Sequence, residues 1–237
     1  MAMNIVRAHP AQLQAGPVQL AVDWEEHGIL GPIRDQGDVV VTCQAIEGLY
    51  NLLNRGSMIQ LSPKHLVDCV RPLATHVYRS YYDDPFQFAV DKGIRMGQAL
   101  PYHPSKHPCV PQKLPVMKIR SWSTIPDYDE EALMRAVSIQ PVAVAVKLAR
   151  HLRIYQQGVY MGSDILDLHP LHRSPDHAIL LTGYGNVEGI DCWKVRNSQG
   201  TDWGIAGTGF IARNSILPSS IPPLLTHGTI PEGPYGF

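Results

Sequence analysis

Apolar positions in the first half of the chain recur at helical spacing. Between Thr42 and Leu53 they fall at positions 45, 46, 49, 50, 52 and 53, which predicts a buried helix that ends at Arg55-Gly56. A second helix is predicted over Ser62–Cys69, because Ser62-Pro63 supply an N-cap and a first-turn residue, and a third over Pro85–Asp91. These segments predict a mostly helical region up to about residue 115.

From Val116 onward the pattern changes to short apolar runs that are typical of strands. The runs cover residues 116–122, 142–147, 158–161, 178–184, 192–196 and 208–212. A helical segment from Asp129 to Ser138 interrupts them. Helices gathered in one half and strands in the other predict the α+β fold class.

Both ends of the chain lack a periodic pattern. Residues 1–21 form a polar arm punctuated by proline and glycine, and residues 215–237 form a proline-rich tail that we expect to be an extended strap or a disordered end. The predicted domain therefore covers residues 22–214.

Composition excludes several classes of partner. The chain has 237 residues, of which 44% are hydrophobic, so it can bury a substantial core as a soluble globular protein, expected to be a monomer. Its 20 basic and 21 acidic side chains leave a net charge of −1 without a long run of one sign, so neither nucleic acid nor an anionic membrane is expected as a partner. The longest apolar runs, such as Ala178–Thr182, are far shorter than the roughly 20 residues of a spanning helix.

Two segments of the second half carry candidate chemistry. His177 enters an apolar strand, and Asn197 follows 20 residues later, just before a turn that contains Gly200 and Trp203. This arrangement can place an imidazole beside a carboxamide, which are the base and the orienting group of a site with a thiol nucleophile. Cys43, which lies 134 residues before His177, is the candidate nucleophile.

Further landmarks support this interpretation. They are Val22–Trp24, Pro32–Gly37, Leu61–Cys69, Leu100–Tyr102, Gln140–Val144 and Tyr155–Tyr160. In this order the chain resembles the mature domain of papain-like cysteine peptidases from Val22 to about Asn214. The resemblance implies two lobes that face each other across a cleft, a helical lobe over about 22–115 and a β-barrel-like lobe over about 116–214. It also implies that His177 is the base, Asn197 its orienter and Gln36 the oxyanion donor.

The sequence around Cys43 departs from the family pattern. The family has Gln-Gly-x-Cys-Gly-Ser-Cys-Trp-Ala-Phe, whereas this chain has Gln-Gly-Asp-Val-Val-Val-Thr-Cys-Gln-Ala-Ile and fewer residues between Cys43 and Gly56. Aligned from Gln36, Cys43 lies beside the nucleophile position at a helix start, where the helix dipole and the imidazole lower a thiol pKa. Aligned backwards from Gly56, Cys43 is an interior helix residue and the nucleophile segment is deleted. The two alignments differ by about 7.5 Å along a helix, whereas proton transfer requires about 3 Å.

Other positions also depart from the family. Gln199 replaces a Trp that shields the His–Asn contact, so a wetter and weaker contact is expected. Ser80 and Tyr81 stand where a Gly-Gly pair forms a cleft wall, and they are expected to fill the substrate subsites unless this loop folds elsewhere. Asp176, which precedes His177, is a further substrate-binding candidate.

The cysteines and the N-terminus leave the cellular compartment open. The resemblance implies a disulfide between Cys69 and Cys109, whose loop of about 40 residues would stabilise the fold by roughly 4 kcal/mol, and the alternative is two buried reduced thiols. Residues 1–7 lack the apolar core of a secretory signal. A native start at Met1 favours the cytoplasm, whereas a processed mature fragment favours a vacuole, a lysosome or secretion.

Two functions therefore compete. The first is a cysteine-type peptidase with impaired activity on peptide or protein substrates, and the second is an inactive relative that binds a peptide or protein partner. A metal site is not expected, because the 11 histidines are scattered without the spacing of metal ligands, and no cofactor is expected.

Overall fold

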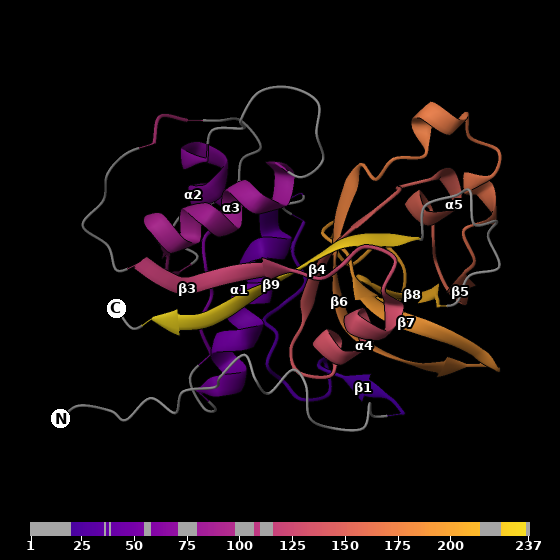
Figure 1. The fold of residues 1–237 in the computed structure, drawn as a ribbon, viewed down its shortest axis with the longest axis horizontal. Helices are drawn as coiled ribbons and strands as arrows, with labels where there is room; N and C mark the ends of the chain where they lie inside the picture. Colours follow the sequence, from indigo (N-terminus) through magenta and orange to yellow (C-terminus); the bar gives the residue numbers. More distant parts are fainter. Residues whose placement is uncertain are drawn as a thin grey trace.

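The computed structural model describes residues 20–35, 37, 39–54, 58–70, 80–97, 107–109, 116–213 and 224–235. Three helices and two short strands make up its first half (Figure 1). They are β1 (Val22–Asp23), α1 (Val39–Leu53), α2 (Pro63–Cys69), α3 (Ser80–Asp91) and β2 (Ile94–Arg95). The predicted N-cap of α2 is confirmed, because the Ser62 hydroxyl accepts the backbone N–H of His65 at 3.3 Å.

The second half is built mainly of strands. It contains β3 (Val116–Thr124), α4 (Glu130–Val137), β4 (Val142–Val146), α5 (Arg150–Arg153), β5 (Val159–Tyr160), β6 (His177–Val187), β7 (Ile190–Arg196), β8 (Thr208–Ala212) and β9 (Leu225–Tyr235). Two 3₁₀ turns, Ser163–Ile165 and Pro170–His172, lie in the connection between β5 and β6. None of the helices in the described ranges is long and apolar enough to cross a membrane.

The strands join in one open sheet with the order β2-β3-β9-β4-β6-β7-β8-β5, and β1 pairs with β6 beside this path. β1 approaches β6 closely at Gly183, where an added Cβ would lie 2.0 Å from the carbonyl oxygen of Val22. A side chain at position 183 would therefore separate the two strands.

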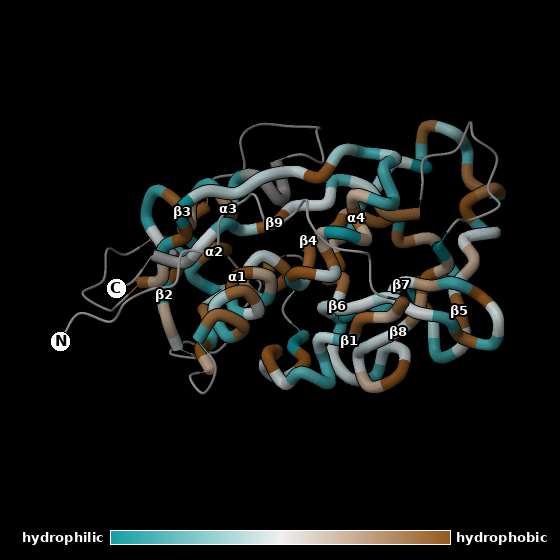
Figure 2. Tube along the Cα trace, turned by 60° about the horizontal axis from the view of Figure 1, so that its bottom comes forward, coloured by the Kyte–Doolittle hydropathy of each residue, from teal (hydrophilic) through white to brown (hydrophobic). Residues whose placement is uncertain are grey.

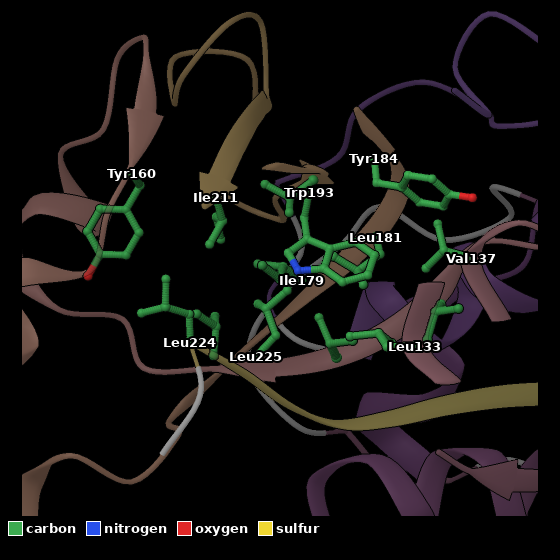
Figure 3. Packing of buried hydrophobic residues seen from close by; sticks show 14 of the residues in the cluster. Leu133, Val137, Tyr160, Ile179, Leu181, Tyr184, Trp193, Ile211, Leu224 and Leu225 are labelled. Atoms are coloured by element: carbon green, nitrogen blue, oxygen red, sulfur yellow. The ribbon is translucent and has the colours of Figure 1, made fainter. Parts of the chain in front are cut away.

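Strands β4 and β6 face a different apolar core on each side. Val142, Val144 and Val146 of β4 belong to the core of the strand-rich lobe, whereas Ala143 and Ala145 belong to the core around α1. This alternation follows from the period of two along a strand. Figure 2 shows β4 as a continuous hydrophobic segment, and Figure 3 shows the strand-rich core, in which the Trp193 ring lies among aliphatic side chains.

Helix α1 starts three residues earlier than the predicted Thr42, at Val39. Valines are stiff at χ1 and are poor helix formers, but Val40 and Val41 are fully buried in the helical core, so their burial outweighs their low propensity. Gly48 lets the helix approach β4, because an added Cβ would lie 2.9 Å from Pro141.

Gln44 is a polar residue on the buried surface of α1. Its side chain is buried, and among the described residues neither its amide nitrogen nor its amide oxygen has a hydrogen-bond partner. We expect Gln44→Met to raise the free energy of unfolding by about 1–3 kcal/mol, because it removes two unsatisfied polar atoms from the core and keeps the side-chain length. Urea unfolding checks this result, and Gln157→Met at an exposed position is the control, with an expected change within about 0.5 kcal/mol. A loss of stability in Gln44→Met alone would contradict the prediction.

The expectation of a C-terminal tail without regular structure is wrong for residues 225–235, which form β9. Pro231 and Pro234 are among the prolines that indicated a tail without regular structure. β4 pairs with residues 225–229 of β9, and β3 pairs with residues 229–235, so both prolines lie where the ladder has one neighbouring strand. A strand tolerates proline at such a position, because the missing N–H breaks no bond to a second neighbour. Residues 214–223 and the N-terminal arm up to residue 19 lie outside the described residues.

Candidate active site

The hairpin of β6 and β7 brings His177 and Asn197 together. His177 is the first residue of β6 and pairs with Val146 of β4, while Asn197 directly follows the last residue of β7. Since Arg196 pairs with Leu180, the two side chains lie near the same end of the hairpin. The backbone N–H of Asn197 donates to Gly207 at 3.0 Å, which anchors the chain as it leaves β7.

The hydrogen bonds of Asn197 define the state of the His177 ring. The Asn197 Oδ1 atom lies 2.7 Å from the backbone N–H of Ser198, which can only donate, so this atom is the amide oxygen. The same oxygen lies 2.8 Å from Nε2 of His177. Nε2 must therefore carry a proton and donate it, which leaves Nδ1 as the basic nitrogen of the neutral ring. This hydrogen bond holds the imidazole in one orientation and one tautomer.

The predicted wet environment of this contact is wrong. Asn197 is 1% exposed and His177 is 8% exposed, so their hydrogen bond is shielded from water although position 199 carries no Trp. Gln199 contributes in another way, because its Oε1 accepts a hydrogen bond from Nδ2 of Asn197 at 3.1 Å. Trp203 is also buried, and its indole N–H donates to the carbonyl of Leu152 at 2.8 Å. This hydrogen bond anchors the turn that follows Asn197.

Cys43 lies inside helix α1. The helix begins at Val39, so Cys43 is its fifth residue and lies about 6 Å along the axis from the first. The side chain is completely buried in the helical core. Burial raises the pKa of the Cys43 thiol well above its usual value, the nearby Glu47 carboxylate raises it further, and Arg34 opposes them. This environment favours the unreactive thiol over the nucleophilic thiolate.

The other cysteines do not supply an exposed thiol either. The sequence has four cysteines, and all four lie in the described part of the chain. Cys69 and Cys109 are joined in a disulfide, and the remaining free thiol, Cys192, is buried within β7. Burial is also the main cause that raises the pKa of Cys192.

Three of the predicted site residues are described only in part or not at all. Gln36 lies outside the described residues, but its neighbour Asp35 forms an isolated bridge with Gln199, next to Asn197. Ser80 and Tyr81 begin helix α3, and their side chains lie outside the described part.

Asp176 has a structural partner on either side. Its carboxylate accepts the backbone N–H of Leu148 at 2.8 Å and pairs with Lys147 at 2.5 Å. These contacts connect the segment before His177 to the segment after β4, and they occupy both carboxylate oxygens. Among the side chains in the described ranges, no group of three His, Cys, Asp or Glu residues is arranged to hold a metal ion.

Sequence reasoning missed the role of Gln199 and the backbone contact of Ser198. A glutamine in a Ser-Gln-Gly turn carries no signal of its own, and the substitution of a family Trp indicated a loss rather than a new hydrogen bond. The signal that was present is the position of Gln199 two residues after Asn197, close enough for side-chain contact.

Comparisons with known proteins identify the relatives of this chain. Residues 18–221 match the family model described as papain family cysteine protease. Cysteine proteinase COT44 of Brassica napus is 33% identical over 222 residues, which cover 90% of this chain and 65% of that protein. The chain therefore spans less than two thirds of the length of this relative.

Two solved structures have the same fold. The proform of the ragweed pollen allergen Amb a 11, a cysteine protease, aligns with a TM-score of 0.78 and 27% identity over 94% of this chain and 68% of that one. The bromelain protease of Ananas comosus, in complex with the E64 inhibitor, aligns with a TM-score of 0.73 and 27% identity over 91% of this chain and 99% of that one. The predicted α+β fold with papain-like architecture is confirmed.

Proposed function

Because this chain belongs to the papain family of cysteine proteases, we propose that it acts on peptide or protein substrates at the site around His177 and Asn197, as a cysteine-type peptidase of impaired activity. The family supports the reaction class, and the oriented imidazole supports retention of the base. In this class the imidazole removes a thiol proton, the thiolate attacks the peptide carbonyl, and Gln36 is proposed to donate to the resulting oxyanion.

The observation that carries the impairment is the state of the thiols. Two of the four cysteines are joined in a disulfide, and the other two are buried, so none offers an exposed thiolate to a substrate. Burial in α1 raises the pKa of the Cys43 thiol well above its usual value, which disfavours the thiolate, and it also separates Cys43 from any peptide.

Covalent labelling tests the impairment directly. We expect a mechanism-based epoxide directed at thiol peptidases to leave Cys43 unmodified in the native protein, in the time that papain is fully modified, because the buried thiol is not ionised. The same protein in denaturant should react at Cys43 with an ordinary alkylating reagent, which shows that the thiol is intact. Peptide mass mapping identifies the labelled cysteine.

His177→Ala is the matched control. Labelling of Cys43 in the native wild-type protein that disappears in His177→Ala would mean that the thiol and the imidazole form an activated pair, and the proposed impairment would be wrong. A fluorogenic peptide assay on both proteins adds a readout of turnover, which should be far below that of papain in the wild type and fall to the background rate in His177→Ala.

Binding without cleavage is a second candidate function, favoured by the complete burial of Cys43. In that case a peptide ligand should shift the NMR signals of the His177 ring without being hydrolysed. Cleavage at a rate that depends on His177 would exclude this candidate, whereas saturable shifts without cleavage would support it over the peptidase.

A further inference from the structure

Gln199 lies at one end of a short chain of side-chain contacts, and the imidazole of His177 lies at the other end. Its Oε1 accepts Nδ2 of Asn197 at 3.1 Å, and Oδ1 of Asn197 accepts Nε2 of His177 at 2.8 Å. We propose that Gln199 is a positioning residue that holds the Asn197 amide, and through it the Nε2-protonated form of His177. This inference rests on the proposed function in that it concerns the same site.

The backbone fixes Gln199 independently of Asn197. Gln199 forms an isolated antiparallel bridge with Asp35, which lies in the segment that leads to α1. The next residue, Gly200, has a φ of +77° and turns the chain, and an added Cβ at Gly200 would lie 3.3 Å from the Cβ of Asp35. The backbone that carries the Gln199 side chain is therefore held against Asp35, within reach of the Asn197 amide.

The polarity of the chain of contacts follows from the donors and acceptors. Nδ2 of Asn197 has only protons to offer, so it needs an acceptor, and Oε1 of Gln199 is the acceptor that it contacts. Asn197 is 1% exposed, so a variant without this acceptor would leave a buried donor unsatisfied. The Asn197 amide would then be more stable if it rotated to place Nδ2 near another acceptor, and its Oδ1 would no longer be held toward His177.

This role differs from that of a shield. The family Trp covers the His–Asn contact, and its indole N–H donates but cannot accept from Asn197. Gln199 is smaller and only partly buried, yet the contact that it serves is buried. The acceptor atom, rather than the volume of the side chain, should therefore determine the effect of a substitution at position 199.

NMR of protein labelled with ¹⁵N at histidine tests this inference without any activity measurement. The His177 signals are assigned by their loss in His177→Ala. In Gln199→Leu we expect the exchange of the Nε2 proton with water to become about 3–10 times faster and the Nε2-protonated form to be less populated, because one hydrogen bond of ordinary net strength is removed. In Gln199→Glu, which keeps an acceptor of the same length, the exchange should stay within about twofold of wild type.

Gln199→Asn is a second variant with a shorter side chain that withdraws the acceptor, and it should behave like Gln199→Leu. Unchanged exchange and an unchanged ring form in Gln199→Leu and Gln199→Asn would overturn the positioning role. Equal acceleration in all three variants would overturn it too, because loss of packing would then be the cause. These readouts are separate from epoxide labelling and turnover, so failure of the proposed function would leave this result interpretable.

Discussion

Replacing Arg34 with methionine is expected to lower the free energy of unfolding by about 3–5 kcal/mol at pH 7, as is usual when one partner of a buried ion pair is removed. Arg34 donates to both carboxylate oxygens of Glu47, at 2.9 and 3.0 Å, and the two side chains are 8% and 1% exposed. Glu47 also accepts the backbone N–H of Leu61 at 2.6 Å. Without Arg34, a negative charge inside the helical lobe loses its closest cation.

The loss should depend on pH. Burial raises the pKa of Glu47, and Arg34 is the strongest influence that lowers it. A carboxyl group whose pKa is raised on folding stabilises the folded state below its unfolded pKa, and that contribution is lost as pH rises through the folded pKa. Removal of Arg34 raises the folded pKa further, so the destabilisation should be larger at pH 8 than at pH 5. Urea unfolding at both pH values measures it.

A double variant provides the control for the ion pair. Arg34→Met combined with Glu47→Leu removes both charges, so it should be less destabilised than Arg34→Met alone and should show a smaller difference between pH 5 and pH 8. A loss below about 1 kcal/mol in Arg34→Met, or equal losses at both pH values, would show that the pair does not carry the stability assigned to it.

Replacing both Cys69 and Cys109 with serine is expected to lower the free energy of unfolding by about 4 kcal/mol. The disulfide closes a loop with a sequence separation of 40 residues, and in the chain-entropy model its removal gives the unfolded chain that much additional freedom. It joins the last residue of α2 to a segment in which the backbone N–H of His107 donates to Asp68 at 2.7 Å. Protein purified without reductant and unfolded in guanidinium chloride gives the measurement.

Reduction of the wild-type protein is the matched control for this pair. A phosphine reductant should lower the stability of the wild type toward that of the double serine variant and leave the variant unchanged. If the reductant has no effect on the wild type at any concentration of denaturant, the two cysteines are reduced thiols and the expected loss does not apply.

The sequence pattern predicted those helices and strands whose ends are set by nearby residues, such as an N-cap. The strand at 208–212 coincides with β8, and the helix between Asp129 and Ser138 is α4, whose N-cap is Asp129. The helix predicted from Pro85 begins instead at Ser80, because proline was taken as a first-turn residue although it lies inside α3. Strand β9 could not be predicted, since its place between β3 and β4 is set by partners 79 to 117 residues away and not by its own pattern.

The candidate site was predictable where its parts lie on one hairpin. His177 and Asn197 are joined by β6 and β7, so their spacing along the sequence is enough to bring them together. The sequence left two positions open for Cys43, at a helix start or inside the helix, because the choice depends on where α1 begins. The low helix propensity of three consecutive valines predicts a helix that begins after them, with Cys43 in its first turn. Because Val40 and Val41 are buried in the core, the helix begins at Val39 instead, and Cys43 lies in its second turn.

The place of β9 in the sheet has a consequence for biosynthesis. β3 and β4 have no direct pairing in the strand order and are joined through β9, which is made after both of them. While residues 225–235 are still inside the ribosome, the described strands can form only two separate pieces, whose edges at β3 and β4 lack the partner that β9 supplies. Such edges are templates for pairing with other chains. We therefore expect the sheet to be completed only after β9 has been made, and until then the edges of β3 and β4 are open to pairing with other chains.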